Sequence, residues 1–151
     1  SWVNHFELLK KIQLKTSGFT EVVPLPFVHM GSPIFLQGNS MPGPTWDEIV
    51  LMHSLARIYF YNTIDNIQAS WVKLGHDGAK VLLNSGVNDL GGTLINENIS
   101  RASGANHGQE TTATEFINLI KDAGKIPYLR NTLYTSFKNL EGVSTQNVIK
   151  I

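Results

Sequence analysis

The chain contains no cysteine among its 151 residues. This absence excludes disulfide bonds, a thiol nucleophile and any iron–sulfur cluster that cysteines of this chain alone would hold. Long apolar runs are absent too, since none approaches the roughly 20 residues that a membrane-spanning helix needs. The first residues lack the basic and then apolar layout of a secretory signal. We therefore expect an intracellular, cytoplasmic protein that does not bind a membrane.

The sequence has no excess of charge of either sign. Lys and Arg together number 12, Asp and Glu together number 12, and the formal net charge is +0. A balanced charge gives no electrostatic footprint for nucleic acid and no attraction to an anionic membrane surface. With 42% hydrophobic residues the chain can bury one core, so we expect a single domain or a piece of a larger one.

The histidines show no spacing typical of metal ligands. A protein-held metal needs ligands that the chain brings together in a recognisable pattern, such as two histidines one helical turn apart. The sequence therefore predicts no metal held by this protein. The five histidines are His5, His29, His53, His76 and His107.

The first third of the chain predicts a helix, a short strand and a long loop. Helical periodicity begins at Trp2, and Gly18 is predicted to cap the end of that helix. Residues 19–28 are rich in branched and aromatic side chains, which favours a strand, but Pro24 and Pro26 remove backbone donors from it. The loop over 29–44 is long for a compact domain, and such loops are usually functional.

Two capping boxes mark the beginning of two further helices. In Thr45–Glu48 and in Thr112–Glu115, a threonine stands three residues before a glutamate, as a capping box requires. The first box predicts a helix that reaches Phe60. The second predicts a helix that Gly124 ends. After it, residues 128–151 are expected to form a mixed, polar tail.

The order of helices and strands indicates an α/β fold. We expect a strand within 64–75, a helix over 77–84, and a strand, a turn and a helix from residue 86 onward. Such alternation implies right-handed crossovers and parallel strands. Three parallel strands leave two apolar edges to protect. The chain therefore fits a part of a larger α/β barrel better than a free-standing doubly wound domain.

Polar groups and glycines gather where the third predicted strand ends. Glycine allows a backbone to approach a ligand closely, and polar side chains at the carboxyl end of a parallel strand are typical of ligand sites in α/β proteins. The same residue types also form plain turns and helix caps, so both interpretations stay open. The residues of this candidate site are Asn88, Asp89, Gly91, Gly92 and Thr93.

Four further side chains are candidates for binding a ligand. Glu97 follows one turn later, where it either orients the site or pairs with Arg101 at i,i+4 spacing. Gln68 and Lys73 belong to the preceding predicted strand and its exit, where Lys73 either meets a carboxylate or points to solvent. His29 stands at the mouth of the long loop and either transfers protons near neutral pH or serves structure alone. No residue is assigned a catalytic role.

Three segments resemble the carboxyl-terminal half of radical S-adenosylmethionine enzymes of the FO synthase family. They are Phe27–Met30, Arg57–Gly75 and Gly86–Gln109. The closest similarity is to the subunit, or fused half, that joins tyrosine to 5-amino-6-(D-ribitylamino)uracil. The resemblance covers most of the chain, from about Phe6 to Tyr134. Enzymes of the futalosine route to menaquinone share the Asn-Asp-x-Gly motif, so that motif marks the wider branch only.

The resemblance implies the C-terminal portion of a (βα) barrel of the TIM type, with the reaction at the carboxyl ends of its parallel strands. In this family an upstream loop of three cysteines holds a 4Fe-4S cluster that binds S-adenosylmethionine. The present sequence departs from that pattern because it has no cysteine. The chain alone is therefore expected to be inactive and to need the missing N-terminal barrel half as a partner. Residues 1–134 are assigned to the barrel and 135–151 to a tail.

The substrates that the resemblance implies are small molecules, tyrosine and ribitylaminouracil, in the biosynthesis of the deazaflavin FO. The site residues that it suggests are those named above, as ligands of substrate or S-adenosylmethionine. Three alternatives stay open at this point. The first is that the chain is part of a futalosine-pathway enzyme. The second is that it is a non-catalytic module that completes a barrel. The third is that it is a decayed product that aggregates through its open strand edges.

Overall fold

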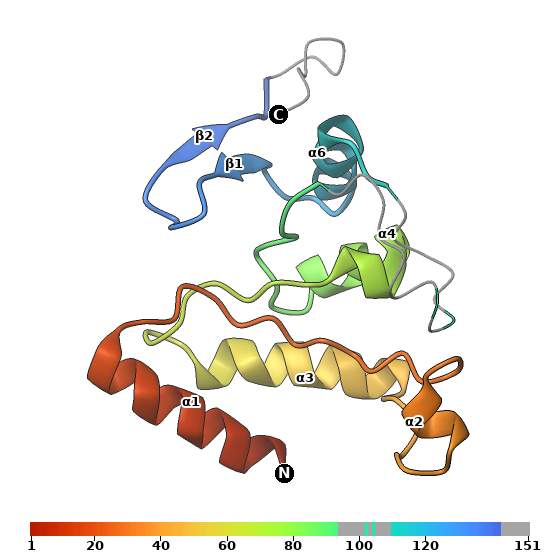
Figure 1. Ribbon diagram of the computed structural model, residues 1–151. Helices are drawn as coiled ribbons and strands as arrows, with labels where there is room; N and C mark the ends of the chain where they lie inside the picture. The colour runs from red at the N-terminus through yellow and green to blue at the C-terminus, as the bar shows by residue number, and fades with distance from the viewer. Residues whose placement is uncertain (94–101, 103, 105–109, 143–151) are drawn as a thin grey trace.

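The computed structural model describes residues 1–93, 102, 104 and 110–142. Its first helix, α1 (Trp2–Thr16), lies beside α3 (Trp46–Tyr59), as Figure 1 shows. Ser17 ends α1 in a left-handed conformation with φ 48° and ψ 30°, and its N–H donates to the Gln13 carbonyl at 2.8 Å. The predicted helix is confirmed. The predicted cap at Gly18 is wrong by one residue, because Ser17 itself takes the left-handed turn.

Three chain segments run parallel at the centre of the fold, where strands were predicted. Parallel bridges pair Val22 with Ile67 and Gln68 with Asp89. The Val22 N–H donates to the Asn66 carbonyl at 2.9 Å, and the Gln68 N–H donates to the Val22 carbonyl at 2.9 Å. The described residues thus form a mixed α/β fragment with a parallel arrangement. The bridges are much shorter than the predicted strands, and the barrel itself stays a prediction.

Two features of the sequence shorten the first two of these segments. Pro24 and Pro26 supply no N–H, so the first segment cannot continue its ladder of hydrogen bonds. The second segment stops at Ser70, which is the N-cap of α4 (Trp71–Leu83). The strand predicted over 64–75 is therefore wrong beyond residue 70. Residues 71 and 72 are both buried in a helical turn and do not alternate across a sheet.

Helix α4 is bent at Gly75, which has φ 70° and ψ 176°. The predicted helix over 77–84 corresponds to the part after the bend. The turn before the bend contains Lys73, which was expected at the exit of a strand. The expected placement of Lys73 at a strand exit is therefore wrong, since Lys73 lies in a helical turn. Gly75 can adopt the positive φ that joins this turn to the rest of α4 because it has no side chain.

The long loop over 29–44 is confirmed, apart from one helical turn, α2 (Pro33–Leu36). Both predicted capping boxes are also confirmed. At the start of α3, the Thr45 N–H donates to the Glu48 carboxylate at 2.7 Å, and the Glu48 N–H donates to Thr45 Oγ1 at 3.3 Å. Helix α6 (Ala113–Asp122) begins in the same way at Thr112. These boxes satisfy backbone donors that a helix leaves free at its N-terminus.

The carboxyl-terminal part contains a β-hairpin that the sequence did not predict. Strands β1 (Tyr128–Arg130) and β2 (Phe137–Asn139) pair antiparallel, with Leu129 opposite Lys138. Each strand has three residues, and both strands are largely exposed, so no alternation of apolar and polar side chains marks them. The expected mixed, polar tail over 128–151 therefore contains a hairpin within its described residues. The domain boundary expected after Tyr134 stays a prediction.

The core lies between α1, α3, α4 and the central parallel segments, and α6 packs against α4 (Figure 1). Phe6 of α1 packs on Phe60, with ring centroids 4.9 Å apart. Burial of one such aromatic side chain contributes about 2–3 kcal/mol. Side chains of this core that are wholly buried are Ala56, Phe60, Ile67, Ala69, Ala79 and Leu82.

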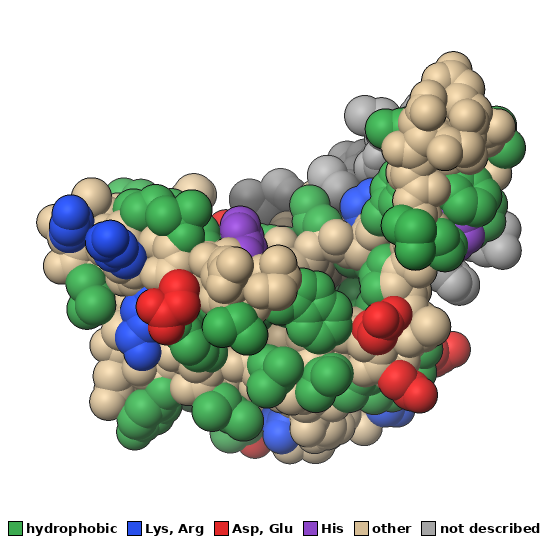
Figure 2. Space-filling view, turned by 90° about the horizontal axis from the view of Figure 1, so that it is seen from below, with side chains coloured by type: hydrophobic (Ala, Val, Ile, Leu, Met, Phe, Trp, Pro, Cys, Tyr) green, Lys and Arg blue, Asp and Glu red, His purple; other side chains and the backbone are tan. Residues whose placement is uncertain are grey.

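Apolar side chains also remain exposed on the face that α1 and α3 form. Figure 2 looks onto this side of the molecule and shows hydrophobic groups spread across it between isolated charges. Val3, Leu14 and Ile58 are 64%, 70% and 73% exposed. In the ranges that the structure describes, no helix has both the length and the hydropathy needed to span a bilayer.

Candidate functional site

Asp89 lies at the centre of a cluster of polar side chains. Arg130 Nε donates to Asp89 Oδ2 at 2.6 Å, and Arg130 Nη2 donates to Oδ1 at 3.0 Å. The Asp89 side chain is only 9% exposed and that of Arg130 is 21% exposed. Two N–H···O bonds between a guanidinium and a carboxylate form a strong, oriented ion pair. A residue 41 positions later in the chain therefore fixes the Asp89 carboxylate.

Glu21, Gln68 and Tyr134 complete this cluster. With its amide nitrogen turned toward the two carboxylates, as their acceptor oxygens require, Gln68 donates to Asp89 Oδ1 at 3.1 Å and to Glu21 Oε2 at 3.2 Å. The Tyr134 hydroxyl donates to the Glu21 carboxylate, and the Tyr134 ring centroid lies 4.1 Å from the guanidinium carbon of Arg130. We call Glu21, Gln68, Asp89, Arg130 and Tyr134 the polar face.

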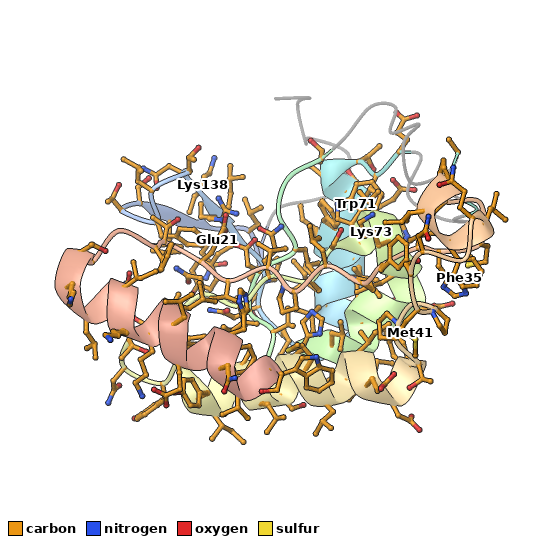
Figure 3. All side chains as sticks on the ribbon, turned by 60° about the horizontal axis from the view of Figure 1, so that its bottom comes forward. Glu21, Phe35, Met41, Trp71, Lys73 and Lys138 are labelled. Carbon is orange, nitrogen blue, oxygen red and sulfur yellow. The ribbon has the colours of Figure 1, made fainter. Side chains whose placement is uncertain are left out.

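The parallel pairing explains why these side chains share one side of the sheet. Successive side chains of an extended segment point to opposite sides, and paired residues point to the same side. Gln68 pairs with Asp89, whereas Val22, next to Glu21, pairs with Ile67 on the side of the core. The polar face is therefore opposite the core-facing side. In Figure 3, Glu21 lies below the hairpin that carries Arg130 and Tyr134.

The polar face carries one net negative formal charge. It contains two acidic side chains and one basic side chain, together with a neutral amide and a phenol. Burial and the hydrogen bond to Glu21 raise the pKa of the Tyr134 hydroxyl far above its ordinary value. The hydrogen bonds to Asp89 raise the pKa of Arg130. At neutral pH Tyr134 therefore stays protonated and donates a hydrogen bond.

The side chain of Asn88, the neighbour of Asp89, lies on the opposite side of the sheet. Arg57 Nη2 donates to Asn88 Oδ1 at 2.6 Å, and Asn88 Nδ2 donates to the Asp65 carbonyl at 3.2 Å. Arg57 also donates to two backbone carbonyls, those of Gly86 and Asp65, at 2.6 and 2.7 Å. These bonds join the end of α3 to two loops of the fold. Asn88 therefore lies outside the polar face, and its amide forms hydrogen bonds that connect elements of the fold.

Gly91 lies directly against the polar face. It has φ 74°, and its N–H donates to Asp89 Oδ1 at 2.6 Å. A Cβ at this position would lie 2.9 Å from the amide of Gln68. Both the positive φ and the close approach therefore require glycine. Gly92 has open space around it, and its carbonyl accepts a hydrogen bond from Trp71 Nε1 at 3.2 Å.

The structure does not gather every candidate at this place. His29 accepts a hydrogen bond at Nδ1 from the Gly43 N–H at 2.8 Å and packs edge-on against Phe35, with centroids 4.6 Å apart. These contacts order the long loop. Lys73 on α4 lies well apart from Glu21 in Figure 3. The candidates that the structure does bring together are Gln68, Asp89 and Gly91.

Two candidates remain without a structural account. Thr93 is exposed, and the helix that it was expected to cap lies outside the described residues, as does Glu97 with its expected partner Arg101. Sequence reasoning in turn missed Glu21, Arg130 and Tyr134. A glutamate within an otherwise apolar predicted strand was the available signal for Glu21. The other two depend on a hairpin that had no local signal.

A hollow of about 390 Å³ lies apart from the polar face, between α1, residues 22–27 and α3, and its lining is mostly apolar. His53 at its edge is 1% exposed, and the imidazole contacts the Ile49 carbonyl through Nδ1 at 2.7 Å, while its buried Nε2 has no partner among the described residues. Burial lowers the pKa of His53. The hollow has His5, Glu48 and His53 among its lining, but no hydrogen bonds join these three side chains, whereas the polar face brings five polar side chains into contact and is the better candidate for a polar ligand.

Comparison with known proteins finds a matching family model and several similar relatives. Residues 16–143 match a family model described as the C-terminal region of CofH/MqnC proteins. The chain is 49% identical over 138 residues to a 5-amino-6-(D-ribitylamino)uracil–L-tyrosine 4-hydroxyphenyl transferase of Methanothermobacter thermautotrophicus, an alignment that covers 91% of this chain and 38% of that protein. It is 49% identical over 137 residues to the Methanopyrus kandleri protein of the same name, covering 91% and 37%.

The chain is also similar to an FO synthase of Mycobacterium leprae. The two are 47% identical over 133 residues, which is 88% of this chain and 15% of the FO synthase. The chain thus spans less than two fifths of the length of each of these relatives. Most of each relative therefore has no counterpart in the sequence described above.

Proposed function

Since the chain belongs to the family of CofH/MqnC C-terminal regions, we propose that it forms the carboxyl-terminal part of a radical S-adenosylmethionine transferase. The proposed reaction joins the 4-hydroxybenzyl group of L-tyrosine to 5-amino-6-(D-ribitylamino)uracil, a step in the biosynthesis of the deazaflavin FO. The observation that carries this proposal is 49% identity over 91% of the chain to relatives that bear this activity in their name.

In this proposal the polar face lines the substrate site. In an α/β barrel one side of the strands packs on the helices, and the other faces the interior, with catalytic groups at the carboxyl ends. The Val22 and Ile67 side of the parallel segments packs in the core with α1 and α3. Glu21 and Asp89, on the other side, would then face the interior, and Gly91 would allow a ligand to approach them.

The residues of this chain do not fit an iron–sulfur cluster. Such clusters are held by cysteine thiolates, and the chain has no cysteine. Within the part of the chain that the structure describes, no three histidine or acidic side chains gather as metal ligands either. Cluster ligands would have to come from the N-terminal barrel half, the proposed partner. No step of the radical chemistry is therefore assigned to residues of this chain.

Binding of S-adenosylmethionine or of a substrate is proposed for the glycine-containing end of the third parallel segment. The supporting observation is that the Gly91 N–H and the Asp89 carboxylate already form a tight turn there, 2.6 Å apart. Gly92, with open space around it, leaves room beside this turn. Roles for Thr93, Glu97, Lys73 and His29 stay predictions, and Asn88 is proposed to support the fold.

A chimera tests the proposed function. The chain would replace the matching segment of the Methanothermobacter relative, and the purified, cluster-loaded protein would be supplied with L-tyrosine and 5-amino-6-(D-ribitylamino)uracil under reducing, anaerobic conditions. We expect a product that contains both substrates, detected by mass spectrometry. The unmodified relative serves as the positive control, and omission of either substrate should abolish the product.

Two results would contradict the proposal. One is a folded chimera that cleaves S-adenosylmethionine but forms no tyrosine–uracil product. The other is turnover of a futalosine-route substrate in its place. That second candidate function is favoured by one observation only, the family description that groups MqnC with CofH proteins. The names of the relatives favour the first function.

A further inference from the structure

We propose that Arg130 is a positioning residue that makes the polar face selective for the hydroxyl-rich ribityl chain and not for the amino-acid end of tyrosine. This inference rests on the proposed function and goes beyond it, because it assigns one substrate group to one surface.

Arg130 contacts both carboxylates of the polar face. Its two hydrogen bonds fix Asp89 at 2.6 and 3.0 Å, and its Nη2 lies 3.6 Å from Glu21 Oε2. The Tyr134 ring stacks on the guanidinium with 4.1 Å between ring centroid and guanidinium carbon. A planar guanidinium held on its edge and on its face has little freedom to rotate. Arg130 therefore sets the positions of Asp89 and Glu21 together.

The charge balance of this cluster decides which ligand group fits it. A substrate carboxylate needs an uncommitted cation, but Arg130 is already paired with two carboxylates. The surface that remains is rich in acceptor oxygens and has one net negative formal charge. Hydroxyl groups donate hydrogen bonds, so a polyol can donate to these carboxylate oxygens, although both N–H groups of the Gln68 amide are already bonded to Asp89 and Glu21. The ribityl chain carries such hydroxyls, whereas the carboxylate of tyrosine would be repelled.

The hairpin gives Arg130 its place. Strand β1 begins at Tyr128, directly after the wholly buried Pro127, and the Leu140 N–H donates to the Pro127 carbonyl at 2.9 Å, which closes the hairpin. Tyr134 takes φ 55° in the turn, so that its hydroxyl reaches Glu21. The hairpin is thus anchored on the polar face at two points, Arg130 on Asp89 and Tyr134 on Glu21.

Matched arginine substitutions test the inference in the chimera described above. Arg130→Lys keeps the charge but loses the two-pronged geometry. Its expected effect is a KM for 5-amino-6-(D-ribitylamino)uracil about tenfold higher, with the KM for tyrosine changed less than twofold. Arg57→Lys is the control, since Arg57 also makes three hydrogen bonds but on the opposite side of the sheet. It should lower the melting temperature and leave the ratio of the two KM values unchanged.

A second variant and a truncated ligand keep the test independent of folding. Asp89→Asn keeps the shape of the side chain and should raise the same KM selectively. A 5-amino-6-alkylaminouracil without hydroxyls, used as a competitive inhibitor, should bind wild type and Arg130→Lys equally well. The inference is overturned if both variants raise the KM for tyrosine instead. It is also overturned if Arg130→Lys weakens binding of the hydroxyl-free inhibitor by the same factor as it raises the KM for 5-amino-6-(D-ribitylamino)uracil. If the wild-type chimera forms no product at all, the proposed function has failed. If it is active but neither variant changes either KM, only the role of Arg130 has failed.

Discussion

Asn88 and Asp89 are neighbours in the chain, yet each is held by a different arginine on a different side of the sheet. Arg57, from α3, binds Asn88 and two backbone carbonyls, and so fastens elements of the fold. Arg130, from the hairpin, binds Asp89 and approaches Glu21. Adjacent polar residues of one motif can thus have different roles, one stabilising the fold and the other forming a site, because side chains alternate along an extended segment.

Replacement of each arginine by alanine should have the largest effects and should separate the roles of Arg57 and Arg130. Arg57→Ala should lower the free energy of unfolding by about 3 kcal/mol, because it leaves backbone carbonyls and the Asn88 amide without charged donors. Arg130→Ala should also cost about 3 kcal/mol, because it leaves the 9% exposed Asp89 side chain without its charged partner, but only this variant should raise the KM for 5-amino-6-(D-ribitylamino)uracil in the chimera. Urea unfolding followed by circular dichroism measures both. A rise of that KM in Arg57→Ala as large as in Arg130→Ala would mean that the two arginines do not have different roles.

The two glycines beside the polar face should differ in how much an added side chain lowers the free energy of unfolding, and this effect is the next largest. Gly91→Ala should cost about 1–2 kcal/mol of unfolding free energy, because it places a Cβ at positive φ and against the Gln68 amide. Gly92→Ala is the matched control and should be close to neutral, since nothing lies within 4 Å of its added Cβ. Thermal melts of the two variants give the difference. A loss at Gly92 as large as at Gly91 would contradict the geometry of this turn.

The smallest effect concerns pH and the core side of the fold. Burial lowers the pKa of His53 below its unfolded value of about 6.5. The unfolded state therefore binds the proton more tightly, so this contribution to stability is complete above about pH 6.5 and is lost as the pH falls from there toward the folded pKa. Stability measured between pH 7.5 and pH 5 should decline less in His53→Gln than in wild type.

His5→Gln provides the control for that titration. His5 is exposed on α1, so its replacement should leave the decline of stability with falling pH as it is in wild type. If His53→Gln and His5→Gln change the pH dependence equally, the burial of His53 is not its cause.

Much of the fold follows from local signals in the sequence. Both threonine–glutamate capping boxes begin helices as predicted, because a cap depends on residues three positions apart. The parallel order of the three segments also follows from alternating helices and strands. The lengths of the segments do not, since Ser70 begins a helix where a strand was expected. Alternation of apolar and polar residues is a weak guide to the end of this strand, because residues 71 and 72 of the following helix are both buried.

The site could be predicted only in part, for a physical reason. The motif around Asp89 and Gly91 is visible in the sequence, but its partner Arg130 lies 41 residues away on an exposed hairpin without a hydrophobic pattern. Which of Asn88 and Asp89 faces the site depends on the register of a single parallel bridge, Gln68 with Asp89. A shift of one residue would exchange their roles, and composition alone does not fix it.

Exchange of the chemistry of these two neighbours tests the division between fold and site most directly. Asp89→Asn should raise the KM for 5-amino-6-(D-ribitylamino)uracil in the chimera, and the free energy of unfolding should fall by about 2 kcal/mol because Arg130 loses a carboxylate partner that is only 9% exposed. Asn88→Asp should leave that KM unchanged, and it should lower the free energy of unfolding by less than about 1 kcal/mol, because the new carboxylate would face the Asp65 carbonyl but would keep Arg57 as its charged partner. A rise of that KM in Asn88→Asp, with no rise in Asp89→Asn, would show that Asn88 and not Asp89 faces the substrate.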